Sequence, residues 1–167
     1  MTLQEMKVLQ AFNAWATLRV FEAVAKLTTE QYTMDMKSSH KNIHGTLTHI
    51  VAAEKMWLSR FVGKPDARLM TSADLPTLPD VKAAWEKVGY ESAKFLGGMT
   101  DKKLQDTFTM TTVRGETFTH VYWHALQHIV DHSTFHRGQI VSMMRQQGVQ
   151  PPSTGLIKFY REVGKSS

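Results

Sequence analysis

Apolar residues recur at intervals of three and four along four long segments of the chain, which is the spacing of one face of an α-helix. The segments cover residues 2–28, 40–63, 80–97 and 118–148. Four such stripes can bury one another, so the pattern predicts an all-α fold, a four-helix bundle in a single domain over residues 1–167. The stripe expected to face the core from the first helix consists of Leu9, Phe12, Ala16, Val20, Ala23 and Leu27.

The stretches between these segments differ in character. Residues 29–39 are expected to form a connection, and residues 64–79 carry three prolines without periodicity, which predicts a long crossover between helices. Residues 107–117 alternate threonine with larger apolar side chains, which predicts a short hairpin or extended excursion before the last helix. A short tail helix over residues 156–163 is expected after Pro151 and Pro152.

The last predicted helix is unusually rich in histidine. A four-residue step advances about 40° around a helix, so a run of histidines at this spacing cannot face one ion as a whole. When a heptad is started at Phe118, His132 and His136 fall on core positions. His120 and His124 point away from the core stripe, and His128 flanks it.

The centred pair His132 and His136 indicates a metal site. Two imidazoles buried on one helical face are costly without a partner, and a divalent ion would satisfy both. A third ligand from another helix would leave positions open for water or substrate. His49 in the second helix is the best donor by residue type, His44 near the helix start is a weaker one, and Glu54 is the carboxylate alternative.

Three side chains near this expected site are candidates for acid–base chemistry or for orienting the ligands. They are Glu54, His128 and Arg137. Glu54 lies within the apolar stripe of the second helix, and a buried carboxylate needs a partner, for which Arg137 or a histidine is suitable. Arg137 follows His136 directly and therefore points about 100° away from it around the helix. An ion pair between helices explains Arg137 as well as an anion-binding role does.

The charge, the cysteine content and the distribution of apolar residues disfavour several functions. The chain carries a net charge of +5, but its basic residues are scattered, so a nucleic-acid partner is weakly supported. There is no cysteine, which excludes disulfides, thiolate ligands and a cysteine nucleophile, so that any metal must use histidine, carboxylate and water. No run of about 18 apolar residues suggests a membrane span, and the N-terminus does not read as a signal peptide, which favours the cytoplasm.

Several stretches of the chain resemble the DinB family of small bacterial four-helix-bundle proteins, which is unrelated to the translesion polymerase of the same name. They are GTLTHIVAAEKMWLSRFVG at 45–63 and HIVDHSTFHRGQI at 128–140, with FNAWA at 12–16 and the PPST segment at 151–154. The resemblance spans nearly the whole chain. It implies one metal ligand in the second helix and two in the last, which correspond to His49, His132 and His136.

The resemblance also implies a divalent ion, zinc or nickel, and a homodimer. It does not imply a single reaction, since relatives include transferases and isomerases that use low-molecular-weight thiols. Two hypotheses about the function therefore remain. The first is a metalloenzyme with an open three-histidine site and thiol-dependent transferase or hydrolase chemistry on a small molecule. The second is a non-catalytic, metal-stabilised binding or stress-response protein.

Overall fold

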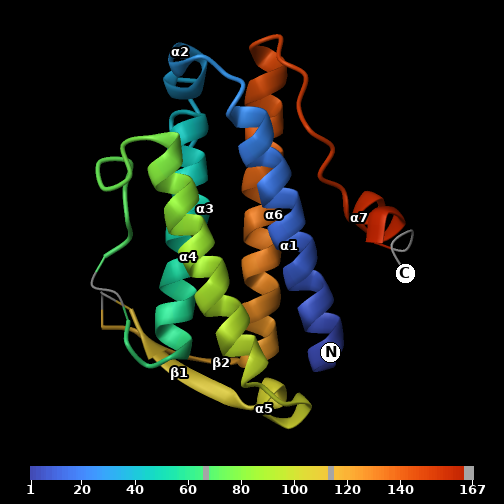
Figure 1. Cartoon of the computed structure of the whole chain (residues 1–167). Coiled ribbons are helices and arrows are strands. Elements are labelled where there is room, and N and C mark those ends of the chain that lie inside the picture. Colours follow the sequence, from blue (N-terminus) through green and yellow to red (C-terminus); the bar gives the residue numbers. More distant parts are fainter. Residues whose placement is uncertain (66–67, 113–114, 164–167) are drawn as a thin grey trace.

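Four long helices lie side by side in the computed structural model, which describes residues 1–65, 68–112 and 115–163 (Figure 1). They are α1 (Leu3–Val24), α3 (Ile43–Phe61), α4 (Leu78–Gly97) and α6 (Tyr122–Gln146). The shorter elements are α2 (Thr29–Thr33), α5 (Asp101–Gln105), β1 (Thr107–Thr111), β2 (Thr117–Val121) and α7 (Leu156–Val163). The expected all-α bundle with a hairpin before its last long helix is confirmed.

The long crossover sets the topology of the bundle. Helices α3 and α4 run in the same direction, and residues 68–77 lie along the side of the bundle and lead back to the start of α4 (Figure 1). Helix α6 packs against both α1 and α3, and α3 packs against α4, whereas α1 and α4 make only sparse contact. The interface between α1 and α4 is therefore the least tightly packed of these four helix–helix interfaces.

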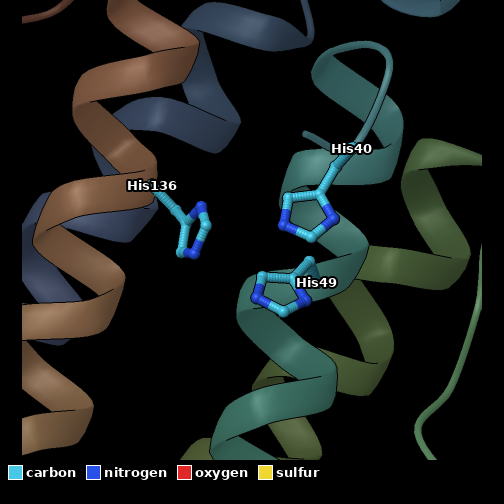
Figure 2. Close-up of side chains that lie close together, drawn as sticks. All are labelled: His40, His49 and His136. Atoms are coloured by element: carbon cyan, nitrogen blue, oxygen red, sulfur yellow. The ribbon is translucent and has the colours of Figure 1, made fainter. Parts of the chain in front are cut away.

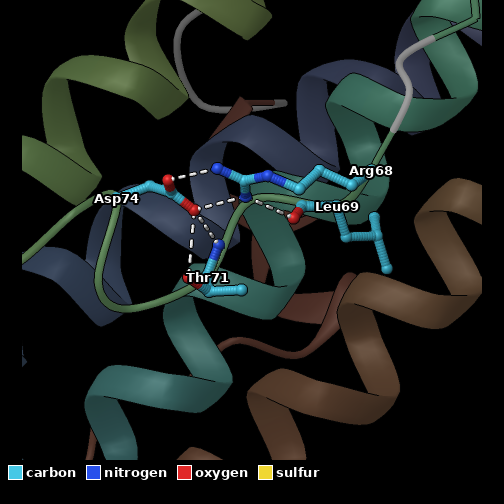
Figure 3. A network of polar contacts seen from close by, with 4 residues as sticks. All are labelled: Arg68, Leu69, Thr71 and Asp74. Carbon is cyan, nitrogen blue, oxygen red and sulfur yellow. Dashed lines mark hydrogen bonds and ion pairs between the residues drawn. The ribbon is translucent and has the colours of Figure 1, made fainter.

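A cluster of polar contacts fixes the second half of the crossover (Figure 3). Arg68 forms two hydrogen bonds of 2.7 Å to the carboxylate of Asp74. The same carboxylate accepts hydrogen bonds from the backbone N–H and the hydroxyl of Thr71, at 2.8 and 2.9 Å. These bonds, with those from Arg68 contributing most, hold the pKa of Asp74 well below its usual range. The contacts are exposed and close the turn that leads into α4.

Polar caps mark the helix starts. A capping box at Thr2 and Glu5 starts α1, and a second one at Thr77 and Asp80 starts α4 at Leu78, slightly earlier than the sequence predicts. A third capping box at Thr28 starts α2 inside the stretch expected to be a plain connection. The first helix accordingly ends at Val24, before the predicted boundary at residue 28.

The last helix begins at Tyr122, so the expected start at residue 118 is wrong. Phe118 is 44% exposed on β2 and is not a core residue. The alternating threonines explain the difference, because β-branched residues favour strands and pair across the hairpin. Thr109 and Thr119 lie directly opposite each other, with their hydroxyl oxygens 3.0 Å apart.

The buried face of α1 is also rotated from the expected stripe. Leu9, Ala23 and Leu27 are only partly buried, whereas Asn13 and Thr17 are buried. The rotation arises because α6 presents a buried cation, Arg137, that needs polar partners on α1. No helix among the described residues has the length and apolarity to cross a membrane.

The apolar core is divided into two main clusters along the bundle. One surrounds Val20, Leu47 and Ile140 near α2, and the other surrounds Met6, Phe61 and Leu126 near the hairpin. Between them lies a buried layer of polar side chains from three helices. We call this the polar layer; it consists of Asn13, Thr17, Glu54, Ser133 and Arg137, with the exposed Thr134 at its edge.

Hydrogen bonds join the polar layer. Oε1 of Glu54 accepts from the amide of Asn13 and from the hydroxyl of Ser133, both at 2.8 Å. Arg137 donates to the side-chain oxygen of Asn13 and to the hydroxyls of Thr17 and Thr134. The partners of Glu54 are therefore an amide and a hydroxyl, and Arg137 is connected to it through Asn13. Burial raises the pKa of Glu54 and lowers that of Arg137 to about 10.

Candidate metal centre

Four imidazoles meet between α3 and α6. His49 comes from α3, His132 and His136 come from α6, and His40 comes from the turn that precedes α3. Figure 2 shows His136 facing His40 and His49 across the space between the two helices. One ring nitrogen from each of these three lies within 4.8 Å of the others. His136 is buried and the other three are half-buried, so the cluster opens to solvent on one side.

The ring of His136 is oriented by a neighbour on its own helix. Its Nδ1 lies 2.9 Å from the side-chain oxygen of Gln139, one turn further along α6. An amide oxygen only accepts, so Nδ1 carries the proton and Nε2 keeps its lone pair. Fixing a tautomer in this way is what a hydrogen-bond partner behind a metal-binding histidine does.

His49 and His132 approach each other across the helix interface. Their Nε2 atoms are 3.0 Å apart, and their ring centres are 4.9 Å apart. The rings of His132 and His136 lie 4.4 Å apart on successive turns of α6, and the ring of His49 lies 4.6 Å from that of His136. The structure thus brings together all three residues that the sequence suggests as ligands.

His40 is the member of the cluster that the sequence analysis missed. Its ring stacks on that of His49, with centres 3.8 Å apart and planes 18° apart. The sequence placed residue 40 at the start of a helix, but Asn42 caps α3 and leaves His40 in the preceding turn. Asn42 immediately before the apolar residues of the helix is an N-cap signal that could have shown this. The stacking itself depends on the folded turn.

The turn that carries His40 is tightly folded against the start of α3. Lys41 adopts the left-handed conformation at φ 66°, and its N–H donates to the carbonyl of Ser38 at 2.9 Å. A Cβ atom on Gly45 would clash with the backbone carbonyl of His40. Glycine at position 45 therefore lets the turn approach the helix closely enough for His40 to reach His49.

Burial favours the neutral form of His40, His49 and His132. Desolvation, followed by the neighbouring imidazoles His40, His136 and His132, lowers the pKa of His49 to about 3. Desolvation and then His136 and His128 lower the pKa of His132 to about 4. The pKa of His40 is lowered for the same reasons, burial first. Neutral imidazole is the form that binds a metal, so these residues need not lose a proton at neutral pH.

Of the three candidates for acid–base chemistry, only His128 lies beside the cluster. It is exposed, and its ring centre is 5.8 Å from that of His132 and 5.4 Å from that of Trp57. Glu54 and Arg137 belong to the polar layer. Among the described residues, no hydrogen bond or ring contact joins either of them to a histidine of the cluster.

The remaining histidines lie elsewhere. His44 is buried, and its Nε2 lies 2.7 Å from the carbonyl oxygen of Leu75. His124 is exposed and packs on its neighbour Trp123, as its direction off the core stripe predicts. His120 belongs to β2 and not to the last helix, and its ring packs edge-on against Trp57.

Comparisons with known proteins agree on one family. The model of the DinB family matches residues 2–162. Protein DinB of Bacillus subtilis is 25% identical to the chain over 169 residues, which cover 95% of this chain and 96% of the relative. The crystal structure of a DinB-like protein from Bacillus cereus superposes with a TM-score of 0.62 at 23% identity, covering 87% of this chain and 94% of that one.

The close approach at Gly45 yields a stability prediction. Gly45→Ala should lower the free energy of unfolding by about 1–3 kcal/mol, because the added methyl group forces the His40 turn away from α3. Gly89→Ala is the matched control, since no heavy atom lies within 4 Å of a Cβ built there. That control should be stabilised by roughly 0.5–1 kcal/mol through helix propensity. Urea unfolding measures both, and an unchanged midpoint for Gly45→Ala would contradict the packing described.

The lowered pKa values of His49 and His132 predict an acid-sensitive apoprotein. Below an ordinary pKa near 6.5 the unfolded chain takes up protons, whereas folded His132 and His49 do not until about pH 4 and 3. The unfolded state therefore binds more protons in this window, and stability falls as pH decreases from about 6.5 towards 4.

Thermal unfolding of the metal-free protein between pH 8 and 4 measures this dependence. The double variant His49→Gln/His132→Gln should flatten it, and His124→Gln, at an exposed position, should not. An equally steep acid loss in the double variant would show that other groups cause it.

Proposed function

The chain belongs to the DinB family, and on that premise we propose that it is a metalloprotein in which His49, His132 and His136 hold one divalent ion, zinc or nickel. The observation that carries this proposal is the convergence of the three half-buried or buried imidazoles from two facing helices. The hydrogen bond from His136 Nδ1 to Gln139 supports it, because it leaves Nε2 available as a ligand.

Two sets of three histidines share His49 and His136 and differ in the third member. His132 is favoured over His40 by ring geometry. A metal lies in the plane of the imidazole that binds it, and the planes of His40 and His49 are nearly parallel, 18° apart. Their in-plane lone pairs therefore run side by side and do not converge on one point. His132 faces His49 with planes 52° apart and Nε2 atoms 3.0 Å apart. In this proposal His40 supports the ring of His49.

The donor set suits open-site chemistry. Three neutral imidazoles leave the charge of a divalent ion uncompensated, so the ion would supply Lewis acidity and lower the pKa of a bound water or thiol. Because the chain has no cysteine, a thiol must come from a cofactor or substrate. We therefore propose a metal-dependent transferase or hydrolase that acts on a small molecule, with a low-molecular-weight thiol as partner.

Side chains at the open edge have roles in this proposal. His128 is exposed beside His132 and is placed to take up or release a proton near the site. Phe135 is 63% exposed, and its ring centre lies 5.1 Å from that of His136, so it offers an apolar wall for a substrate. Glu54 and Arg137 hold the helices together and take no part in proton transfer. A homodimer would use bundle surface and leave this edge open.

A second candidate is a non-catalytic, metal-stabilised binding or stress-response protein. The observation in its favour is that two of the three acid–base candidates, Glu54 and Arg137, are engaged inside the polar layer. That leaves His128 as the titratable candidate beside the cluster. Such a protein would bind the ion with the same three histidines and show no turnover.

The ligand assignment predicts the metal content of variants. Untagged wild-type protein should hold one zinc or nickel ion per chain, and His132→Ala or His136→Ala should lose it, since two imidazoles do not complete the site. Elemental analysis after gel filtration measures the stoichiometry. His120→Ala and His124→Ala are the matched controls and should keep the ion. His40→Ala should keep it with weaker affinity, and loss of the ion in His40→Ala but not in His132→Ala would replace His132 by His40 as ligand.

If the protein is a metal-dependent enzyme, we expect thiol-dependent turnover. A panel of low-molecular-weight thiols and small electrophiles should give a product whose formation stops on chelation and returns when zinc or nickel is added. His128→Gln should reduce kcat by about 10²-fold, the lower end of the range for a proton-transfer residue, and leave metal content unchanged. Full metal loading with no turnover across the panel would favour the non-catalytic candidate.

A further inference from the structure

A cavity of about 440 Å³ opens between α1 and α4, the pair of helices with sparse contact. Its described lining comes from all four long helices and contains none of the clustered histidines. On α1 the lining runs from Lys7 to Ala14, a stretch that lies between Met6 of one core cluster and Val20 of the other. The cavity therefore occupies the gap that the divided core leaves.

Small residues at the interface between α1 and α4 keep the cavity accessible. Ala11 and Ala14 line it from α1, and Gly89 and Ala93 line it from α4. Gly89 lies within α4, where glycine costs about 1 kcal/mol relative to alanine, and no heavy atom lies within 4 Å of a Cβ built there. Packing therefore does not require glycine at position 89. The absence of a side chain preserves the opening.

Most of the interior of the cavity is apolar. Leu58 and Phe61 come from α3, Leu126 and Ile129 come from α6, and Leu96 comes from α4. These walls favour an apolar body, since transferring such a surface out of water is favourable. A volume of about 440 Å³ is within the size range of pockets for small molecules.

One buried carboxylate interrupts these apolar walls. Glu54 lines the cavity and is only 8% exposed. Both of its hydrogen bonds, from Asn13 and Ser133, go to Oε1. Among the described residues no hydrogen bond reaches Oε2. Oε2 is not among the enclosed side-chain atoms that lack a partner, and Glu54 lines the cavity, so Oε2 is an acceptor that a ligand in the cavity can reach.

We propose that this cavity binds a small, largely apolar molecule that carries one N–H or O–H donor and places that donor on Oε2 of Glu54. The site is separate from the histidine cluster and does not depend on the metal proposal. The preference for a donor follows from the two bonds already made to Oε1, which leave Oε2 as the acceptor that faces the ligand. The apolar walls set the rest of the chemistry.

Indole and benzofuran test the donor requirement, because they have the same shape and differ in that an N–H is replaced by an oxygen. Titration of full-length protein, followed by amide chemical shifts and calorimetry at pH 8, should show indole binding at least tenfold more tightly than benzofuran. Shifts should concentrate at α1 residues 7–14 and α4 residues 85–97. Equal affinity for the two probes, or no binding of indole at millimolar concentration, would overturn the proposal.

Glu54→Gln tests the role of the carboxylate. Asn13 and Ser133 would hold the amide oxygen where Oε1 lies, so the variant presents an NH₂ group to the cavity in place of an acceptor. The preference for indole over benzofuran should then disappear. Retention of the tenfold preference in a folded Glu54→Gln protein would show that Glu54 does not receive the donor.

Gly89→Phe tests the location without altering the polar layer. The new ring would fill the opening, so indole affinity should fall by more than tenfold while the helical circular dichroism is unchanged. Gly138→Phe is the matched control, because it too replaces a glycine within a long helix with open space around it, but lies outside the cavity lining. Unchanged indole binding in Gly89→Phe, or equal losses in both variants, would place any binding elsewhere and contradict the proposal.

Discussion

The hydrogen-bonded pairing of α3 with α6 through Glu54 and Ser133 is the contact on which the rest of the structure depends. Burying a carboxylate and a guanidinium in the bundle is costly unless both are hydrogen-bonded, and Asn13 from α1 links Glu54 to Arg137. A shift of one helical turn between α3 and α6 would separate Glu54 from Ser133. The polar layer therefore favours one alignment of α3 along α6. Apolar side chains at the same level would distinguish less sharply between alternative alignments.

That register also places the histidine cluster. Ser133 and Arg137 are four residues apart on α6, and each directly follows a histidine, His132 or His136. The two pairs project from different faces of the same two turns, one into the polar layer and the other towards His49 on α3. Hydrogen bonding in the interior thus determines which imidazoles meet on the other face. Gln139 on α6 and the tight turn at Gly45 add the finer constraints, orienting His136 and bringing His40 onto His49.

The sequence predicted those parts of the fold that depend on local pattern. Three- and four-residue spacing gave the four long helices, alternating threonines gave the hairpin, and the centred pair His132 and His136 with His49 gave the residues that converge. What it missed depends on tertiary partners. The face that α1 buries is set by Arg137 on another helix, and the position of His40 is set by a left-handed residue at Lys41 and a close approach at Gly45. Phe118 was misplaced because a helical period continued by chance into a strand whose pairing partner lies in β1. The cavity beside Glu54 likewise depends on how far apart α1 and α4 lie.

We propose that the register imposed by the polar layer assembles a metal site from His49, His132 and His136. Anomalous diffraction from crystals of the metal-loaded protein, measured on both sides of the zinc or nickel absorption edge, tests it most directly. We expect a single strong anomalous peak per chain, bounded by the rings of these three histidines and open on the side of His128. A peak held by His40 in place of His132, or one located at His120 and His124 with none between α3 and α6, would contradict it.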